Sequence, residues 1–434
     1  MGSFIGLDFG TTNSALARAD ASGTIELARF AHATGETNTF RSVLYFEEPS
    51  RGTGRIAAVA GPRAFDRRLE SEGRGRLLQS LKSYLAARSF TATNVLGTAY
   101  SLEELIAIVL RQIRAEAEQQ FGTLPTRAVF GRPVRFVGLE GDDDEAFPLK
   151  RLRAAAALAG FEDVAFEYEP VAAAHFYERR LDHDEIVLVA DFGGGTSDFC
   201  VMRVGPNARR EARGASRILG TEGVGLAGDA FDSEIVDHVV APRLGMGGSY
   251  RSYMDGKLIA IPPWLYARLR RWHHLSFLKS RDTMNFLREV RSQAIERDAI
   301  DALIHVIEDD LGYALYRSVE GTKLALSSAT EATFSFHDEP VHIEENVARA
   351  AFEAWIAEQL DAIAASVDRL LASTGLAPSA IDRVFMTGGS SFVPAVRAIF
   401  ESRFGAAKLS DGDELTSVAL GLASVARDRE IRSS

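Results

Sequence analysis

Cysteine is almost absent from this sequence, which has Cys200 as its one thiol among 434 residues. A single cysteine excludes an internal disulfide framework and is typical of a reducing compartment. The nine histidines are scattered and, with so little sulfur beside them, form no zinc-type ligand pattern. We therefore expect a cytoplasmic protein that is held together by its packed cores.

Long hydrophobic runs are also missing, because no apolar stretch approaches the roughly 18 residues of a membrane-spanning helix. The start of the chain, from Phe4 to Asp8, lacks a basic region and a long apolar core, so it predicts a strand and not a secretory signal. The net charge of −11 repels nucleic acid and anionic membranes. We expect neither as a partner, and the length predicts two or three domains.

Two charged segments have ordinary structural interpretations. The basic segment 268–281 is expected to form an amphipathic surface helix with four apolar side chains turned inward, namely Trp264, Leu269, Trp272 and Phe277. The acidic run 142–145 lacks the spacing of an EF-hand, so we expect a solvated loop before a helix.

The most informative feature is a duplication about half a chain apart. Segments 4–17 and 186–201 each contain an apolar strand, then Asp-Phe-Gly, then a turn of small residues with threonine, then a second strand-like run. The residues after each turn keep their β character, so each unit is predicted to be a hairpin.

These two hairpins favour phosphate chemistry. Successive small residues allow several backbone N–H groups to point at one anion, and threonine hydroxyls add donors. Asp8 and Asp191 end their strands, where a carboxylate can hold hydrated Mg²⁺ through water. Asp-x-Gly also makes ordinary turns, but two related copies in one chain favour a nucleoside triphosphate site. No Walker-A string is present.

A second glycine pattern, G-x-G-x-x-G at 223–228, lies in a poor context for a dinucleotide site. Residues 218–222 before it favour a loop, and Asp229 follows it directly, where a pyrophosphate needs an uncharged helix start. We expect a helix over 229–240 instead.

Other patterns complete an α/β architecture. Periodicity predicts helices over 102–120 and 344–373, which Gly122 and Gly375 would end. Residues 384–387 predict a strand that leads through a glycine turn into a helix from about Val393.

At this point the sequence resembles the actin-like ATPase superfamily and, within it, the nucleotide-binding domain of the heat shock protein 70 (DnaK-type) chaperones. Segments 5–14 and 191–198 are similar to that family's two phosphate loops. Further similar motifs follow in the family's order at 169–174, 226–232, Lys323 with 326–328, and 388–390. The chain is similar in length to the short YegD-like bacterial members, which lack the peptide-binding half.

The resemblance implies an actin-like fold of two related lobes, duplicated ribonuclease H-like units, around a nucleotide. Lobe I would span 1–184 and lobe II 185–410, with an extended insert at about 240–312. Residues 411–434 would form a C-terminal helix that returns to lobe I.

The resemblance also implies roles for individual residues. Catalysis is assigned to Lys82, Glu169, Asp191 and Thr196. Mg²⁺ would be held through water by Asp8, Asp191 and Asp198. ATP or ADP would contact Gly10, Thr11, Thr12, Asn13, Gly193, Gly194, Gly195, Thr196, Gly228, Asp229, Glu320, Lys323, Ser327, Gly388, Gly389, Ser390 and Phe392. From the residues alone, Lys82 is a surface lysine on an amphipathic helix and Glu169 is an acidic residue at a helix start.

The sequence departs from the family in three places. Leu324 and Phe392 stand where the family has the two arginines that sandwich adenine. The insert adds residues where exchange factors dock, and Gly421 is followed by only 13 residues, so we expect neither an interdomain linker nor a peptide-binding domain.

The expected function is slow, Mg-dependent ATP hydrolysis by a heat shock protein 70-like chaperone that lacks the peptide-binding domain, with a protein partner or client bound through the insert. The alternatives are a non-hydrolysing nucleotide-gated scaffold and a small-molecule kinase or phosphatase of the same superfamily. A polymerising filament is the weakest alternative.

Overall fold

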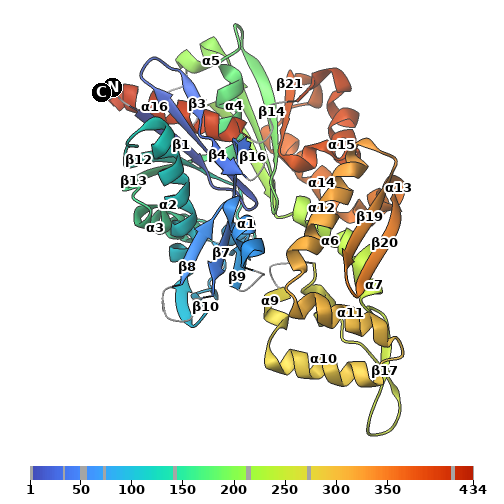
Figure 1. The fold of residues 1–434 in the computed structure, drawn as a ribbon. Helices are drawn as coiled ribbons and strands as arrows, with labels where there is room; N and C mark the ends of the chain where they lie inside the picture. The colour runs from blue at the N-terminus through green and yellow to red at the C-terminus, as the bar shows by residue number, and fades with distance from the viewer. Residues whose placement is uncertain are drawn as a thin grey trace. The chain divides into compact units, whose positions relative to one another are not determined.

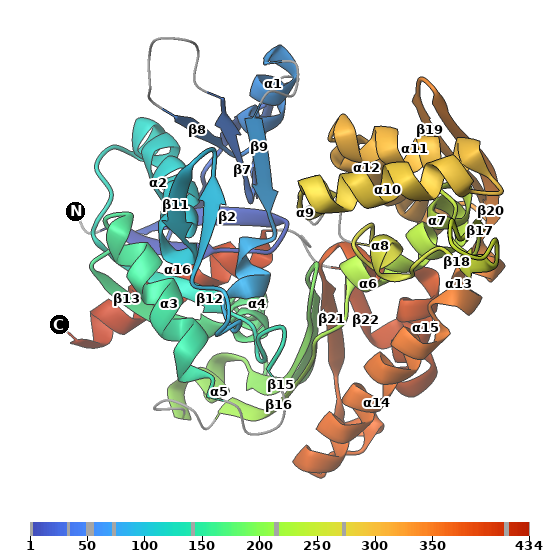
Figure 2. The same ribbon diagram turned by 90° about the horizontal axis from the view of Figure 1, so that it is seen from below.

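The computed structural model describes residues 3–32, 35–48, 56–71, 75–139, 144–211, 217–270, 275–411 and 416–433 (Figures 1 and 2). The chain divides into two compact units. Unit 1 contains Met1–Gly228, Asp361–Ser391 and Val396–Ser434, and unit 2 contains Asp229–Leu360 and Phe392–Ala395. Within the described ranges, no helix is both long and apolar enough to cross a membrane.

The strands, in chain order, are β1 (Ser3–Asp8), β2 (Asn13–Asp20), β3 (Ile25–Leu27), β4 (Phe30–His32), β5 (Gly35–Thr37), β6 (Phe40–Arg41), β7 (Val43–Glu47), β8 (Ala57–Ala60), β9 (Gly75–Gln79), β10 (Ala92–Val95), β11 (Thr98–Ser101), β12 (Arg127–Arg132), β13 (Asp163–Tyr168), β14 (Glu185–Phe192), β15 (Ser197–Val204), β16 (Ile218–Val224), β17 (Ser249–Arg251), β18 (Leu258–Ala260), β19 (Glu331–Asp338), β20 (Val341–Ala348), β21 (Arg383–Thr387) and β22 (Leu409–Asp411).

The α-helices are α1 (Arg63–Glu70), α2 (Leu102–Phe121), α3 (Ala146–Leu158), α4 (Glu169–Glu178), α5 (Pro206–Glu211), α6 (Gly228–Ile235), α7 (Ala241–Arg243), α8 (Trp264–Ala267), α9 (Leu275–Leu278), α10 (Arg281–Gln293), α11 (Arg297–Glu308), α12 (Gly312–Ser328), α13 (Arg349–Trp355), α14 (Ala357–Thr374), α15 (Pro394–Phe404) and α16 (Ser417–Ser433). Short 3₁₀ turns are η1 (Leu81–Tyr84), η5 (Pro378–Ala380), η6 (Gly389–Phe392) and η7 (Ala406–Lys408), and η3 (Val236–Val240) is a π-helical turn.

Unit 1 contains two sheets with the same strand arrangement. The first has the order β13-β12-β1-β2-β3, and the second has the order β22-β21-β14-β15-β16. In each, the central strand (β1 or β14) pairs antiparallel with its hairpin partner on one side and parallel with a later strand on the other. The duplication in the sequence is therefore a duplication in topology, and both predicted hairpins are confirmed.

The C-terminal helix α16 packs directly against β1, β2 and α4. A Cβ atom at Gly421 would lie 1.8 Å from the backbone oxygen of Ala172 in α4. This position therefore accepts only glycine, because the neighbouring backbone cannot give way. Residues about 250 positions apart in the chain are locked together at this contact.

Several predicted helices are confirmed. Helix α2 ends at Gly122 as expected, and Ser101 and Glu104 form a capping box at its start. It lies beside α3 in both views (Figures 1 and 2). The helix expected over 229–240 is present as α6 followed by the π-helical turn η3. The glycine turn after β21 leads into α15, also as expected.

The helix predicted over 344–373 is wrong at its start. Residues 344–348 belong to β20, which pairs with β19, and the helical part begins only at Arg349. The side chains of Val341, Ile343 and Val347 alternate inward, which is the period of a strand and not of a helix. The helical end at Thr374, before Gly375, is confirmed.

The loop expected at 218–222 is also wrong, because these residues lie in β16. This strand pairs antiparallel with β15 and is half-buried along its whole length. Its glycine and threonine residues give no alternation, so pairing with a neighbour supplies a structure that the local sequence does not specify.

The single helix expected over 268–281 is interrupted. Ser280 caps the start of α10 by accepting a hydrogen bond from the Thr283 N–H, so a new helix begins there. Leu269 is buried as expected, but Trp264 is 46% exposed, which contradicts the prediction for that residue. The predictions for Trp272 and the side chain of Phe277 lie outside the described residues.

The acidic run is described only from Asp144, which is exposed; Asp142 and Asp143 lie outside the described residues. The Asp144 carboxylate accepts a hydrogen bond of 2.9 Å from the Ala146 N–H at the start of α3. The expected helix after the run is confirmed.

We predict that Gly421→Ala destabilises the chain by about 1–3 kcal/mol, because the added methyl group overpacks the contact between α16 and α4. Thermal unfolding monitored by circular dichroism measures the effect. Gly321→Ala in α12 is the matched control, because a Cβ there meets nothing within 4 Å. Equal melting temperatures for the two variants would contradict the close packing of α16.

Candidate phosphate and metal site

The first phosphate-loop candidate joins β1 to β2. Asp8 is the last residue of β1 and lies opposite Ala15 in the hairpin. The Gly10 N–H donates to the Ser14 Oγ at 3.2 Å, and the Thr12 oxygen accepts from the Ser42 N–H at 2.9 Å. These bonds fix the loop 9–12, whose residues other than Phe9 remain partly exposed. Asn13 accepts a side-chain hydrogen bond of 3.3 Å from Arg41.

The second loop joins β14 to β15 in the same way. Asp191 and Asp198 lie opposite each other in the register, and the Gly193 N–H donates to the Thr196 oxygen at 2.9 Å to close the turn. Gly194 and Thr196 are both half-buried. Gly195 belongs to the same half-buried turn.

Both aspartates of the second hairpin are held by hydrogen bonds. The Thr387 hydroxyl, at the end of the parallel strand β21, donates to the Asp191 Oδ1 at 2.6 Å. The Asp198 Oδ1 accepts from the backbone N–H groups of Val134 and Arg135 at 2.7 and 3.2 Å. Asp198 is therefore fixed by the segment that follows β12 of the other sheet.

Lys82 and Glu169 form a close ion pair, with 2.7 Å between the Lys82 Nζ and the Glu169 Oε1. Their side chains are only 10% and 8% exposed. Lys82 lies in η1 and not on a surface helix, so the interpretation from local pattern alone is wrong. Glu169 is the first residue of α4, followed by Pro170, as its helix-start position predicts.

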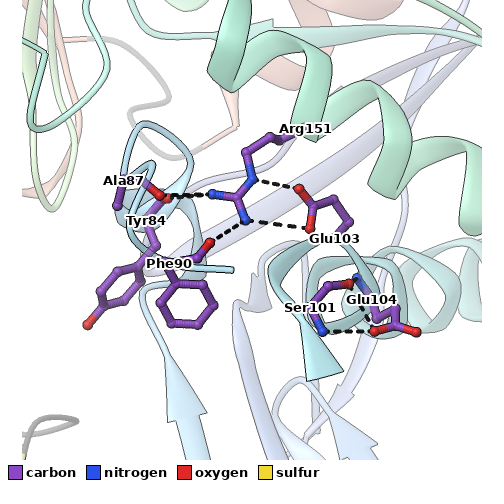
Figure 3. A network of polar contacts seen from close by, with 7 residues as sticks. All are labelled: Tyr84, Ala87, Phe90, Ser101, Glu103, Glu104 and Arg151. Carbon is purple, nitrogen blue, oxygen red and sulfur yellow. Dashed lines mark hydrogen bonds and ion pairs between the residues drawn. The ribbon is translucent and has the colours of Figure 1, made fainter. Parts of the chain in front are cut away.

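Arg151 of α3 holds the segment that follows Lys82 (Figure 3). Its guanidinium donates to the backbone oxygens of Tyr84, Ala87 and Phe90 at 3.3, 3.2 and 3.0 Å. The same group donates to Glu103 of α2 at 2.6 Å. This network ties the end of η1 to two helices, so the lysine is presented from a rigid turn.

Burial and mutual repulsion raise the pKa values of three carboxylates in the site. Burial raises the pKa of Asp8 to about 8, repulsion from Glu169 adds to this, and Lys82 opposes it. Burial and repulsion from Glu169 also raise the pKa of Asp198 to about 8 and that of Asp191 to about 6. Like charges at close range thus disfavour full ionisation.

One ammonium group faces these four carboxylates. Burial alone lowers the pKa of Lys82, but attraction to Glu169 and to Asp8 outweighs it, so the pKa is raised and the lysine stays charged. A single positive charge leaves the ionised cluster strongly negative. Carboxylate oxygens are the preferred ligands of Mg²⁺, directly or through water, so the donor set and the excess charge both fit this cation.

A third glycine turn follows β21. Gly388 has a φ of 84°, and a Cβ there would lie 2.0 Å from the Phe192 backbone oxygen, so only glycine fits. The Ser391 hydroxyl donates to the Gly388 oxygen at 2.6 Å. Gly389 is exposed, whereas Ser390 is buried.

The remaining predicted nucleotide residues are close to the start of α6 or on α12. Gly228, whose N–H donates to the Gly193 oxygen at 3.4 Å, ends a segment of unit 1. Asp229, Glu320, Lys323 and Ser327 belong to unit 2. The Lys323 Nζ lies 2.7 Å from the Asp232 Oδ1.

Leu324 and Phe392, at the adenine-stacking positions, both lie in unit 2. They are 66% and 50% exposed. The exposed Phe392 ring is available to stack on a flat ligand, whereas Leu324 has no aromatic face.

Sequence reasoning missed four contributors. Thr387 directly precedes the recognised glycine turn, and a hydroxyl at the end of the strand before that turn was the available signal. Val134 and Arg135 act through backbone N–H groups, so their side chains gave no signal. Asp232, which anchors Lys323 and also accepts from Tyr316 at 2.7 Å, could be found only from the fold.

Two sheets of one topology, each with Asp-Phe-Gly at the end of its central strand, define an α/β protein of duplicated design. The sequence model described as Hsp70 protein matches residues 4–243 and 301–427. The chain therefore belongs to the Hsp70 family and has its actin-like ATPase fold. The family match leaves out residues 244–300.

Named relatives match almost the whole chain at modest identity. The chaperone protein DnaK of Thermus thermophilus is 27% identical over 425 residues, which are 93% of this chain and 57% of that protein. The chloroplastic stromal 70 kDa heat shock-related protein of Pisum sativum is 27% identical over 423 residues, 92% of this chain and 49% of that protein. The chain thus spans about half the length of these relatives.

The pKa shifts predict that the metal-free chain loses stability as pH rises. The three aspartates bind protons in the folded state up to about pH 6 to 8, but only up to about 3.8 when unfolded. The folded state therefore holds more protons between these values, and the free energy of unfolding falls as pH increases through them. Asp8→Asn should weaken this fall and raise the melting temperature at pH 8 in EDTA.

Mg²⁺ should reverse the trend, because a bound cation replaces the protons and stabilises more at pH 8 than at pH 5. Differential scanning calorimetry across pH measures both effects. Asp361→Asn, an exposed position on α14, is the control. A stability of the metal-free chain that rises steadily from pH 5 to pH 8 would contradict the crowded-carboxylate site.

Proposed function

We propose that this chain binds ATP with Mg²⁺ and hydrolyses it slowly. The observation that carries the proposal is the Lys82–Glu169 pair among three aspartates, beside two turns rich in backbone donors. Family membership supports it, because the curated relatives include chaperones. The relatives are only 27% identical to this chain, so the proposal depends mainly on the residues of the site.

The duplicated sheets support a finer proposal for the architecture. We propose that 1–184 and 185–410 are related lobes, that the insert at about 240–312 belongs to the second, and that 411–434 returns to the first. The packing of α16 on β1 and β2 supports the last assignment. The compact units divide elsewhere, after Gly228, so lobes and units are different descriptions of the chain.

For phosphate binding we propose the two loops. Thr11, Thr12 and Asn13 would meet the β- and γ-phosphates, and Gly194, Gly195 and Thr196 would cradle the γ-phosphate. Asp8, Asp191 and Asp198 would hold Mg²⁺ through water. The bound cation neutralises charge on the phosphates; the protein's task is to fix its water shell.

Lys82 has the position and charge for transition-state stabilisation. It stays protonated, and its neutralising effect on a leaving phosphoryl group is large because it is buried. When its ammonium turns from Glu169 to phosphate, the Glu169 carboxylate is released to accept a proton from the attacking water. The same pair therefore supplies the stabilising positive charge and the carboxylate that orients water.

The nucleoside contacts are proposed from the resemblance. Contacts to ribose, phosphates and adenine are proposed for Gly228, Gly388, Gly389 and Ser390 of unit 1 and for Asp229, Glu320, Lys323 and Ser327 of unit 2. Phe392 offers the one aromatic face at a stacking position, and Leu324 offers none, so we propose weaker selection of adenine than two arginines give.

We propose a reducing, cytoplasmic compartment as well. Cys200 is buried, and burial raises the pKa of its thiol to about 12, so it is protonated and unreactive at neutral pH.

Lys82→Ala tests the enzymatic role. We predict an about hundredfold lower rate of single-turnover ATP hydrolysis, because one buried charge that stabilises the transition state is lost. Calorimetric binding of Mg-ATP should change far less. Lys150→Ala on the exposed face of α3 is the matched control.

Two other results would support the alternative functions. Equal phosphate release from wild type and Lys82→Ala would mean a nucleotide-gated scaffold and would contradict the ATPase proposal. Turnover that rises sharply with one small metabolite, but not with unfolded protein, would favour the kinase or phosphatase alternative.

A second proposal concerns the insert, where the β17–β18 hairpin leaves apolar side chains exposed. Met254 is 98% exposed, and Tyr253, Leu258 and Ile259 are also exposed. The outer edge of β17 is covered, because Ile295 donates its N–H to the Ser249 oxygen at 3.0 Å. Among the described strands, none pairs with the other edge of β18. The hairpin extends beyond α10 (Figure 1).

We propose that an extended apolar polypeptide, the client, adds to the free edge of β18. Backbone hydrogen bonds supply the affinity of such strand addition, and exposed apolar side chains supply the selectivity. Ile259→Asp should weaken binding about tenfold by placing a charge in the contact. Fluorescence anisotropy of a labelled valine- and leucine-rich unfolded peptide measures it.

Asn285→Asp, which adds the same charge on exposed α10 of the same insert, is the control. Unchanged peptide binding by Ile259→Asp would contradict the assignment of β18. An equal loss in both variants would show a general effect of charge, and would also contradict it.

A further inference from the structure

The hairpin β19–β20 has one buried and one exposed face. Its strands pair residue by residue from Glu331 opposite Ala348 to Asp338 opposite Val341. The inward side chains are apolar and buried: Phe334, Phe336, Val341, Ile343 and Val347. The hairpin packs through this face on α12, and α11 and α13 contact β20. Its backbone is therefore fixed by unit 2, and its outer face is free.

Three ligand-type side chains gather on that outer face. His337 lies directly opposite His342 in the register, with ring centroids 3.8 Å apart. Glu344 follows His342 by two residues on the same side, and its Oε2 lies 3.7 Å from the His342 Nε2. One ligand atom from each of the three residues lies within 4.8 Å of the others.

We propose that His337, His342 and Glu344 form a binding site for a divalent transition-metal ion, with zinc as the best match. Two imidazoles and one carboxylate are a donor set that zinc takes in proteins. Mg²⁺ prefers oxygen ligands, so this site is distinct in chemistry from the aspartate cluster of unit 1.

The local structure favours ligation over the alternative of a solvated surface face. The two rings make no hydrogen bond to other residues within the described part of the chain, so their nitrogens are available. The three side chains share one face because of strand alternation and register, not by chance proximity of loops. Small rotations must bring the donors to about 3.3 Å from one another, the spacing of a tetrahedral zinc shell.

The packing of the β19–β20 hairpin reduces the free energy needed to bring the three donor side chains together. His305 of α11 contacts Asp338, the residue beside His337, with 2.7 Å between His305 Nε2 and Asp338 Oδ1. The strand beside His337 is therefore anchored to α11, and we expect the donors to approach one another by side-chain rotation. Three protein ligands leave a fourth position for water, which makes the site open and exchangeable.

The test uses the untagged full chain in the absence of nucleotide, titrated with Co²⁺ and Zn²⁺. We expect one strong Zn²⁺ site by calorimetry and visible absorption bands of four-coordinate Co²⁺. His337→Ala and His342→Ala should each weaken Zn²⁺ binding by about tenfold or more, because even outer ligand partners are worth that much. Glu344→Gln should also weaken it.

Ser335→Ala is the matched control, since Ser335 is exposed on the same face and lies opposite Glu344. Circular dichroism checks that each variant is folded, as expected for substitutions on the outer face. Zinc affinity that is unchanged in both histidine variants, or lost equally in Ser335→Ala, would overturn the proposal. Because ATP plays no part, neither result bears on ATP hydrolysis.

Discussion

The excess of negative charge at the ends of β1 and β14 is the constraint on which the candidate site depends. Asp8, Asp191 and Asp198 are brought together with Glu169, and the positive charge of Lys82 offsets part of their negative charge. Such a cluster costs stability unless a bound cation offsets its charge. The carboxylates stay close together because two sheets of the same topology hold them in place.

The surrounding structure rigidifies this arrangement from several directions. Arg151 ties the lysine turn to α2 and α3, Thr387 orients Asp191, and backbone groups of Val134 and Arg135 fix Asp198. Helix α16 packs against β1, and its contact with α4 admits no side chain at Gly421. The site is thus preorganised, which is what positioning and electrostatic catalysis of phosphoryl transfer require.

The sequence could predict the parts whose physics is local. Hairpins at 4–17 and 186–201, the capped helix α2 and the glycine turn at Gly388 follow from turn chemistry and periodicity. Local patterns do not predict β16, which has no alternation of buried and exposed residues, or the strand end at 344–348, which runs directly into a helix. The burial of Lys82 and the donors to Asp198 arise only when segments far apart in the chain are placed side by side, whereas the pair His337–His342 depends on the register of the local β19–β20 hairpin.

We propose that the carboxylate cluster binds nucleotide together with magnesium. Isothermal titration of ATP into the wild-type chain, once with Mg²⁺ and once with EDTA, tests it most directly. The account predicts one site that binds Mg-ATP and loses most of its affinity without the metal. Absence of binding, or equal affinity with and without Mg²⁺, would contradict it.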